Sequence, residues 1–199
     1  MPKPIRQRIE EEMTGAALPF VAFCIALNFT AFQITVALKI PIYLDSIGTI
    51  LVAVLIGPWS AIICGSAASL LAAAFGNPSM IFFIPVVIVI GAFTGFLAKR
   101  GWFRKWYLVV MGGILQGVLA ALVSAPIAAY VFGGVMMAGT DFLVLYFRAV
   151  GNTLLDSVIF QGLASDPVDK VTSYLIVFFL TKNLPQRLLS RLRGASNVK

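Results

Sequence analysis

The chain contains no histidine and only two cysteines, and charged residues occupy just 12% of its 199 positions. The lack of histidine excludes imidazole acid–base catalysis, histidine metal ligands and any serine–histidine triad. Cys24 and Cys64 lie inside apolar runs at no spacing typical of a zinc or redox motif, so we expect small packing residues there. The sequence also lacks a Gly-x-x-x-x-Gly-Lys-Ser/Thr loop, which excludes ATP hydrolysis by that route.

Apolar residues take the place of the missing charges. They make up 60% of the chain, and its mean hydropathy is +0.96. A soluble domain is about 45–50% apolar and about 25% charged. Apolar runs of about 18 residues or more, long enough for a hydrocarbon core of about 30 Å, recur along the sequence. The sequence therefore predicts a polytopic membrane protein, and its polar start "MPKPIRQRIEEEMTG" does not resemble a cleavable signal.

Six apolar stretches are predicted to form a compact bundle of six transmembrane helices, so the fold class is an all-α integral membrane protein. They cover residues 15–38, 46–57, 58–75, 80–98, 107–133 and 167–184. The second is short, and Gly57-Pro58 predicts a tight corner after it. We divide the chain into a cytoplasmic tail, a membrane domain and a basic cytoplasmic tail, at residues 1–14, 15–185 and 186–199.

The segment 140–165 is predicted to be an amphipathic helix on the outer side. Asp141, Arg148, Asn152 and Asp156 follow one another at steps of seven, four and four, which places them on one helix face. Two charges near the bilayer centre would cost roughly 5–7 kcal/mol. A helix at the surface, or dipping into a cavity, avoids most of that cost.

The basic residues indicate which way the chain crosses the bilayer. With six spans, only Lys39, Arg148 and Lys170 of the 15 basic residues fall on the outer side. Such an asymmetry predicts cytoplasmic N- and C-termini in a bacterial plasma membrane. The net charge of +7 then follows from membrane orientation and requires no nucleic-acid partner.

The stretch "ASDPVDK" is predicted to begin the last span. Asp166 suits the N-cap, Pro167 the first helical position, and Asp169 the positive end of the helix dipole. Outer charges would have to pair, as Lys170 would with Asp169 or Asp166. A metal-bound aspartate pair is the alternative, but it would need a second acidic motif on the same face.

A small-molecule pocket is predicted on the outer side. Such pockets combine an apolar, aromatic wall with a few placed polar groups, and the outer loops supply both. Asp45 would alternatively cap the second span. The candidate substrate-binding residues are Tyr43, Asp45, Asn77, Arg148, Asn152 and Asp156.

Small residues recur at four-residue spacing on several spans, as Ala22 and Ala26 do on the first. Such rows let helix backbones approach closely in lipid. Most are expected to serve internal packing, and the Ala22/Ala26 row is a candidate contact for a partner subunit.

With these features the chain resembles the substrate-binding S components of energy-coupling factor (ECF) transporters. The resemblance rests on "PIYLDSIGTILVAVLIGPWSAIICGSAASLL", an outer "GNPS" loop, a "KRGWFRKW" loop and the late "SDPVDK", and it covers residues from about 18 to 185. It implies a binding subunit for a vitamin or related micronutrient, with neither a cofactor nor a metal of its own. The subunit would dock on a transmembrane coupling subunit with two cytoplasmic ATPases, and it would topple in the membrane to deliver its ligand. Ala22 and Ala26 match the family's row that contacts the coupling subunit.

Other functions remain open from the sequence. A self-sufficient secondary transporter usually shows inverted repeats around a midplane ion site, and no repeat is visible here. A membrane sensor domain would use the basic tail as a former linker, and a membrane enzyme of isoprenoid type would depend on the "SDPVDK" aspartates. We expect a transport subunit rather than an enzyme, and the sequence does not identify the micronutrient.

Overall fold

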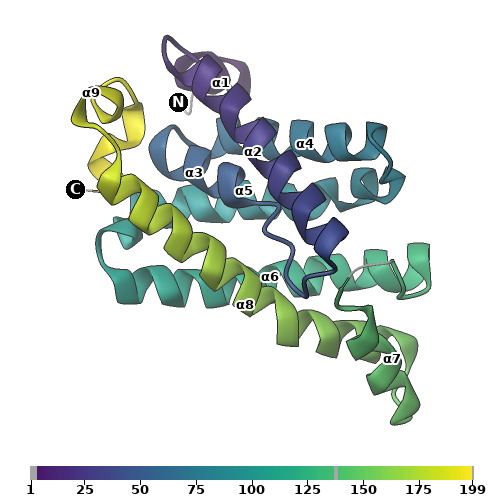
Figure 1. The fold of residues 1–199 in the computed structure, drawn as a ribbon. Helices are drawn as coiled ribbons and strands as arrows, with labels where there is room; N and C mark the ends of the chain where they lie inside the picture. Colours follow the sequence, from purple (N-terminus) through teal and green to yellow (C-terminus); the bar gives the residue numbers. More distant parts are fainter. Residues whose placement is uncertain (1–3, 137–138, 199) are drawn as a thin grey trace.

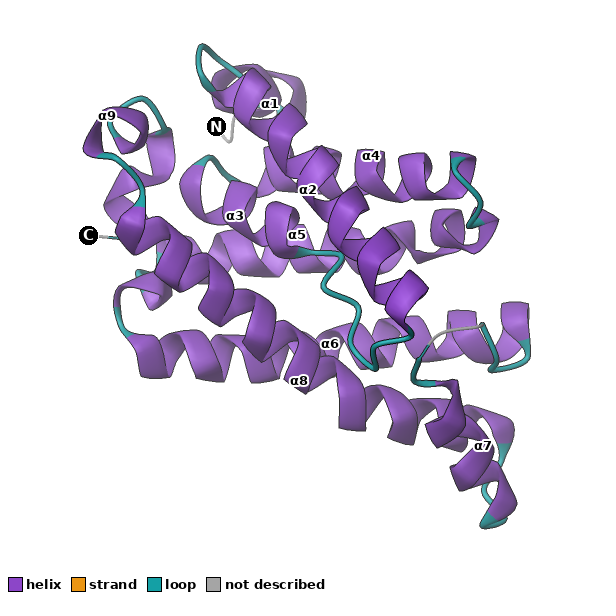
Figure 2. Cartoon of the chain, viewed as in Figure 1, coloured by secondary structure: helices purple, strands orange, loops and turns teal. Residues whose placement is uncertain are grey.

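The structure is a computed structural model that describes residues 4–136 and 139–198, so residues 1–3 and 199 of the two expected tails lie outside it. The described part is built from helices without strands (Figures 1 and 2). These are α1 (Ile5–Glu12), α2 (Ala17–Leu38), α3 (Ile47–Leu55), α4 (Pro58–Ala74), η1 (Pro78–Phe83), α5 (Ile84–Lys99), η2 (Trp102–Arg104), α6 (Trp106–Phe132), α7 (Asp141–Ala149), α8 (Leu154–Asn183), α9 (Gln186–Leu189) and η3 (Arg193–Asn197).

Three helical segments of the described chain are long and apolar enough to cross a membrane: α2, the continuous stretch Pro78–Lys99, and α6. The apolar helix α4 is shorter, at 17 residues. Large apolar side chains project outward from such segments, including Phe23 on α2 at 60% exposed and Leu122 on α6 at 52% exposed. Exposed side chains of this kind suit lipid tails rather than water. The prediction of an all-helical membrane protein is confirmed, whereas the count of six spans stays a prediction.

Helix α3 is the centre of the bundle rather than a full span. Its nine residues are all buried, and at 1.5 Å per residue it is far shorter than a hydrocarbon core. It crosses α2 at Gly48, where an added Cβ would lie 2.2 Å from the carbonyl oxygen of Cys24. The buried Asn28 side chain fixes this crossing, because it accepts from the Gly48 N–H at 2.6 Å and donates to the Thr49 hydroxyl at 2.8 Å.

Helices α6 and α8 pack along one another through small residues of α6. A Cβ added to Gly117 would lie 2.3 Å from the Cα of Pro167, and one added to Gly113 would lie 2.7 Å from the Cα of Val171. The row of small residues on α6 therefore serves internal packing, as expected for close helix contacts in lipid.

The prediction of one amphipathic helix over 140–165 is wrong. The segment divides into α7 and the beginning of α8, separated by a turn at residues 150–153. The α8 N-terminus is fixed by Thr153, whose hydroxyl accepts the Asp156 N–H at 3.2 Å and donates to the Asp156 carboxylate at 2.5 Å. This reciprocal pair resembles a capping box, so the helix begins there.

Consequently, the prediction that Asp166 caps the last span is also wrong. Asp166 and Pro167 lie in the middle of the 30-residue helix α8. Proline removes one backbone N–H from the helix, but the close approach of Gly117 holds the α8 backbone against α6 at this point. Proline inside a helix is tolerated in membrane proteins where neighbouring helices support the backbone.

Both ends of the described chain pack against the same end of the bundle (Figure 1). Glu12 of α1 is buried, and its carboxylate accepts the Ser60 N–H in the first turn of α4 at 2.8 Å. From the C-terminal segment, the Asn197 side chain donates to the Val54 carbonyl of α3 at 2.8 Å. These contacts tie the expected tails to the membrane domain and leave the other end of the bundle free to hold a ligand.

Candidate functional site

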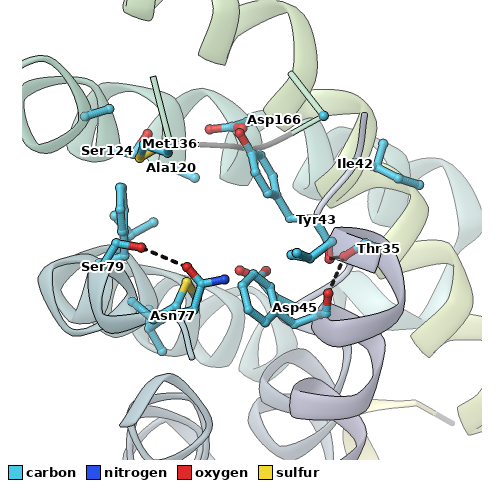
Figure 3. A pocket seen from close by; sticks show the side chains of 18 of the residues that line it. Thr35, Ile42, Tyr43, Asp45, Asn77, Ser79, Ala120, Ser124, Met136 and Asp166 are labelled. Carbon is cyan, nitrogen blue, oxygen red and sulfur yellow. Dashed lines mark hydrogen bonds between the residues drawn. The ribbon is translucent and has the colours of Figure 1, made fainter. Parts of the chain in front are cut away.

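A cavity of about 290 Å³ lies between the C-terminal end of α2, the connection 39–46, η1, α6 and α8 (Figure 3). Figure 1 shows the connection after α2 and the beginning of α8 on the side of the molecule away from the two termini. The walls of the cavity come from the last turns of α2, the connection 39–46, η1, the start of α5, the second half of α6 and the first half of α8. The lining residues are Phe32, Thr35, Val36, Ile40, Ile42, Tyr43, Asp45, Gly76, Asn77, Ser79, Met80, Phe83, Val86, Val87, Ile90, Ala120, Ser124, Ala128, Met136, Gly139, Val158, Gln161, Asp166 and Lys170.

The connection 39–46 forms one wall because it is hydrogen-bonded on both sides. On the α2 side, the buried Thr35 hydroxyl donates to the Tyr43 carbonyl at 2.9 Å. On the α8 side, the Asp169 carboxylate accepts the N–H groups of Tyr43 at 3.0 Å and Leu44 at 2.8 Å. Leu44 adopts a left-handed φ of 50°, which is uncommon for a residue other than glycine. These bonds hold the backbone in that conformation.

Lys170 lies beneath this wall in an ion network. Its ammonium donates to Asp169 Oδ2 at 2.5 Å and to Ser46 Oγ at 3.0 Å, and it reaches Asp45 Oδ1 at 3.5 Å. Asp169 and Lys170 are both buried, so removing one charge would leave the other unpaired in the interior. The predicted pairing of Lys170 with Asp169 is confirmed.

A chain of polar side chains runs along the wall from Tyr43 to Asp166. The Tyr43 hydroxyl lies 2.8 Å from the Thr140 hydroxyl and accepts from Gln161 Nε2 at 3.4 Å. Gln161 also donates to Ser165 Oγ at 2.8 Å, and Asp166 follows directly on the same helix. Burial, and then the charge of Asp166, raise the pKa of the Tyr43 phenol, so it remains a neutral hydrogen-bonding group.

The facing walls are mostly apolar. Phe32, Met80 and Phe83 supply ring and thioether surface to the cavity. Asn77 adds a side-chain amide, whose oxygen accepts from the Ser79 hydroxyl at 3.2 Å (Figure 3). An apolar cavity with a few convergent polar groups is the usual form of a small-molecule site.

The donor set does not fit a transition-metal ion. Within the described residues, no group of three or more histidine, cysteine, aspartate or glutamate side chains converges in a metal-binding arrangement. The carboxylates of Asp45 and Asp169 both contact the Lys170 ammonium. A divalent cation placed between them would be repelled by that ammonium.

Three of the residues selected from the sequence line the cavity: Tyr43, Asp45 and Asn77. They come from two connections that the sequence placed on the outer side. The structure brings them to one cavity, and their role in binding stays a prediction.

The other three selected residues lie outside the cavity lining. Arg148 is exposed on α7, and the Asn152 side chain donates to the Phe147 carbonyl at 3.0 Å at the α7 C-terminus. Asp156 is exposed and caps α8 together with Thr153. The structure gives Asn152 and Asp156 local contacts at helix ends, and a ligand role for the three residues remains untested.

Sequence reasoning missed the cavity residues on α8. Gln161, Asp166 and Lys170 were assigned to a surface helix or to a helix start, yet they line the cavity. The available signal was the four-residue spacing of Asp166 and Lys170, which places these two polar side chains on one face of a single continuous helix, whereas Gln161 lies about 140° around the helix from Asp166.

The Ala22/Ala26 row lies on the outer surface of α2. Both alanines are exposed, and Phe23 between them is 60% exposed. No other element of the described chain covers this row, so the face is open to lipid or to a partner. The proposed contact with a partner subunit stays a prediction.

One family model matches residues 5–182, which is most of the chain. It is described as CbiM, cobalt uptake substrate-specific transmembrane region. No curated protein and no solved structure matches the chain.

Proposed function

Because the chain belongs to the CbiM family of cobalt-uptake substrate-specific transmembrane regions, we propose that it is the substrate-binding membrane subunit of an ECF-type importer. ATP hydrolysis would then occur on partner subunits, since the sequence has no P-loop. The subunit would span the membrane six times with cytoplasmic termini, as the distribution of basic residues predicts.

We propose an organic micronutrient of vitamin type as the substrate. The observation that carries this proposal is the cavity of about 290 Å³ with aromatic and apolar walls. Its size is near the lower end of small-molecule pockets, which favours a compact ligand. Polar groups on two facing walls, Tyr43 and Asn77, would orient such a molecule.

Cobalt is a second candidate substrate, favoured by the description of the family. Imidazole is the usual protein ligand of the later first-row transition metals, and soft thiolates bind zinc and copper(I). The chain has no histidine, and Cys24 and Cys64 are buried in the bundle without lining the cavity. The chemistry of the cavity therefore favours an organic substrate over a bare metal ion.

Delivery to the cytoplasm would use the Ala22/Ala26 face of α2 to dock on the coupling subunit. The face is exposed, and its small side chains would let a partner helix approach closely. The subunit would then topple with its ligand enclosed. Lys170 and Asp169 beside the cavity are paired with one another within the protein, which lowers the cost of tilting that end into lipid.

Co-expression with a coupling subunit and two ATPases tests this function. Affinity purification of this chain is expected to recover the three partners, and uptake is expected to stop when the P-loop lysines of the ATPases are replaced. Ala26→Leu is expected to abolish partner recovery while the purified chain still retains its substrate. Uptake without partner subunits would instead identify a secondary transporter, and neither uptake nor partners would favour a sensor domain.

A further inference from the structure

We infer that the substrate carries a cationic nitrogen and that the Asp166 carboxylate is its counter-ion. The inference rests on the proposed function, because it assigns a ligand chemistry to the same cavity. It follows from the distribution of charge around Lys170, which is the cation that lines the cavity among the described residues.

The hydrogen-bond donors of Lys170 are directed at protein acceptors, although the contact with Asp45, at 3.5 Å, is long. An ammonium group offers three N–H donors. These are directed to Asp169 Oδ2 at 2.5 Å, Ser46 Oγ at 3.0 Å and Asp45 Oδ1 at 3.5 Å. Asp169 in turn accepts three hydrogen bonds, so it forms a closed unit with Lys170 and the connection 39–46. This unit is structural and nearly neutral.

No cation contacts Asp166 directly in the described chain, although the charge of Lys170, one helical turn further on, attracts it from a distance. Asp166 is only 6% exposed, and it lies on the cavity wall next to the Tyr43 ring (Figure 3). Its one hydrogen bond within the described chain comes from Ser165 Oγ at 3.4 Å, which is long and weak. Asp166 forms no ion pair within the same described residues. A buried carboxylate with no cation in contact is costly, and a ligand that supplies the opposite charge at contact distance lowers that cost.

Asp45 adds to the negative potential. It also lines the cavity, and its contact with Lys170 is 3.5 Å long. Asp45, Asp166 and Asp169 together carry more negative charge than the single Lys170 ammonium cancels. An anionic ligand would be repelled by this excess of negative charge, whereas a cationic ligand would be attracted by it.

The rest of the lining indicates what carries the cation. Phe32, Tyr43 and Phe83 present aromatic rings to the cavity, and Met80 presents a thioether. Aromatic faces attract organic cations and stack on flat rings. The substrate class is therefore a compact ring compound with a protonated or quaternary nitrogen.

The test uses the full chain purified in detergent and a deproteinised bacterial cell extract. The extract is spiked with equimolar cationic, neutral and anionic vitamins: thiamine and pyridoxamine, riboflavin and pyridoxine, pantothenate and biotin. Free compounds are removed by size exclusion, and the retained compounds are identified by mass spectrometry. The affinity of the retained compound is then measured for the wild type, Asp166→Asn and the control Glu10→Gln, which alters an exposed carboxylate on α1.

The wild type is expected to retain a cationic ring compound. Its affinity is expected to fall about thirtyfold or more in Asp166→Asn and to stay unchanged in Glu10→Gln. Retention of a neutral or anionic compound would overturn the assignment of charge and leave the proposed function standing. Retention of no compound, or tight binding of cobalt chloride alone in a parallel titration, would overturn both the assignment of charge and the vitamin-type substrate, whereas the importer function itself fails only if no partner subunits are recovered. If Asp166→Asn does not fold, the charge of the compound that the wild type retains still tests whether the substrate is a cation.

Discussion

Replacing Asp169 by asparagine is expected to destabilise the protein strongly. The substitution keeps the shape of the side chain but removes the charge that pairs with Lys170 at 2.5 Å. Both side chains are buried, at 0% and 5% of side-chain exposure, so solvent does not screen the loss. Breaking one partner of a buried ion pair costs about 3–5 kcal/mol. Asparagine keeps one acceptor for the N–H groups of Tyr43 and Leu44, so we expect the lower end, about 3 kcal/mol.

Thermal unfolding in detergent measures this effect. For a chain of this length, about 3 kcal/mol corresponds to a fall of about 6–12 °C in Tm. Glu10→Gln is the matched control, because it removes the same kind of charge from the exposed pair with Arg6 on α1. Exposed pairs contribute little, so the control is expected to unfold close to the wild type.

A double-mutant cycle separates the ion pair from other effects. The variant that combines Asp169→Asn with Lys170→Met removes both buried charges, so it is expected to be more stable than Asp169→Asn alone. A Tm for Asp169→Asn within about 1 °C of the wild type would show that the buried pair does not stabilise the fold, since it corresponds to less than about 0.5 kcal/mol. Strictly additive effects of the two substitutions would show that the side chains are not coupled.

Three further substitutions test the packing of the bundle by the same unfolding measurement. Gly48→Ala is expected to lower stability by about 2 kcal/mol or more, because its Cβ would lie 2.2 Å from the Cys24 carbonyl; a neutral effect would contradict the α2–α3 crossing. Glu12→Ala is expected to cost about 1–2 kcal/mol, since the carboxylate accepts an N–H in the first turn of α4, and an unchanged Tm would mean that α1 does not cap that helix. Tyr174→Phe is expected to cost about 1 kcal/mol, because it leaves the buried Thr94 hydroxyl without its partner at 2.8 Å; a gain in stability would argue against that hydrogen bond.

The apolar pattern predicted most of the helices because each long apolar run ends at a clear signal. Gly57-Pro58 marks the corner between α3 and α4, and the structure places the helix boundary at these residues. The apolar stretch 46–57 is short, so the sequence already indicated that α3 is shorter than a full membrane span. Its position at the centre of the bundle was not indicated, because a helix that is apolar on every side gives no direction for packing.

The division of 140–183 could not be predicted from periodicity alone. Asp166-Pro167 has the same form as a helix start, yet the chain continues through it as one helix. Thr153 and Asp156 form a capping pair, which is a second possible helix start. The neighbouring sequence gives no reason to prefer Thr153 or Asp166 as the start of the helix. The contact of Gly117 with Pro167 decides between them, and it joins residues 50 positions apart in the sequence.

Only part of the candidate site was predicted from the sequence, because the start of α8 was placed too late in the chain. Tyr43, Asp45 and Asn77 follow from the rule that polar loop residues at one end of a bundle converge. Asp166 was not selected as a cavity residue because it was predicted to be an N-cap, and that structural role already accounts for a carboxylate at a helix start. Its function as a cavity residue appears only when α8 is seen to begin a full three turns earlier.

Native mass spectrometry of the full chain, purified after growth in rich medium and released from detergent, detects whatever molecule the cavity holds. We expect a population whose mass exceeds that of the polypeptide by one compact organic molecule, which dissociates as a positively charged ring compound. A bound population that carries only the mass of a cobalt ion would show that the cavity does not hold an organic cation.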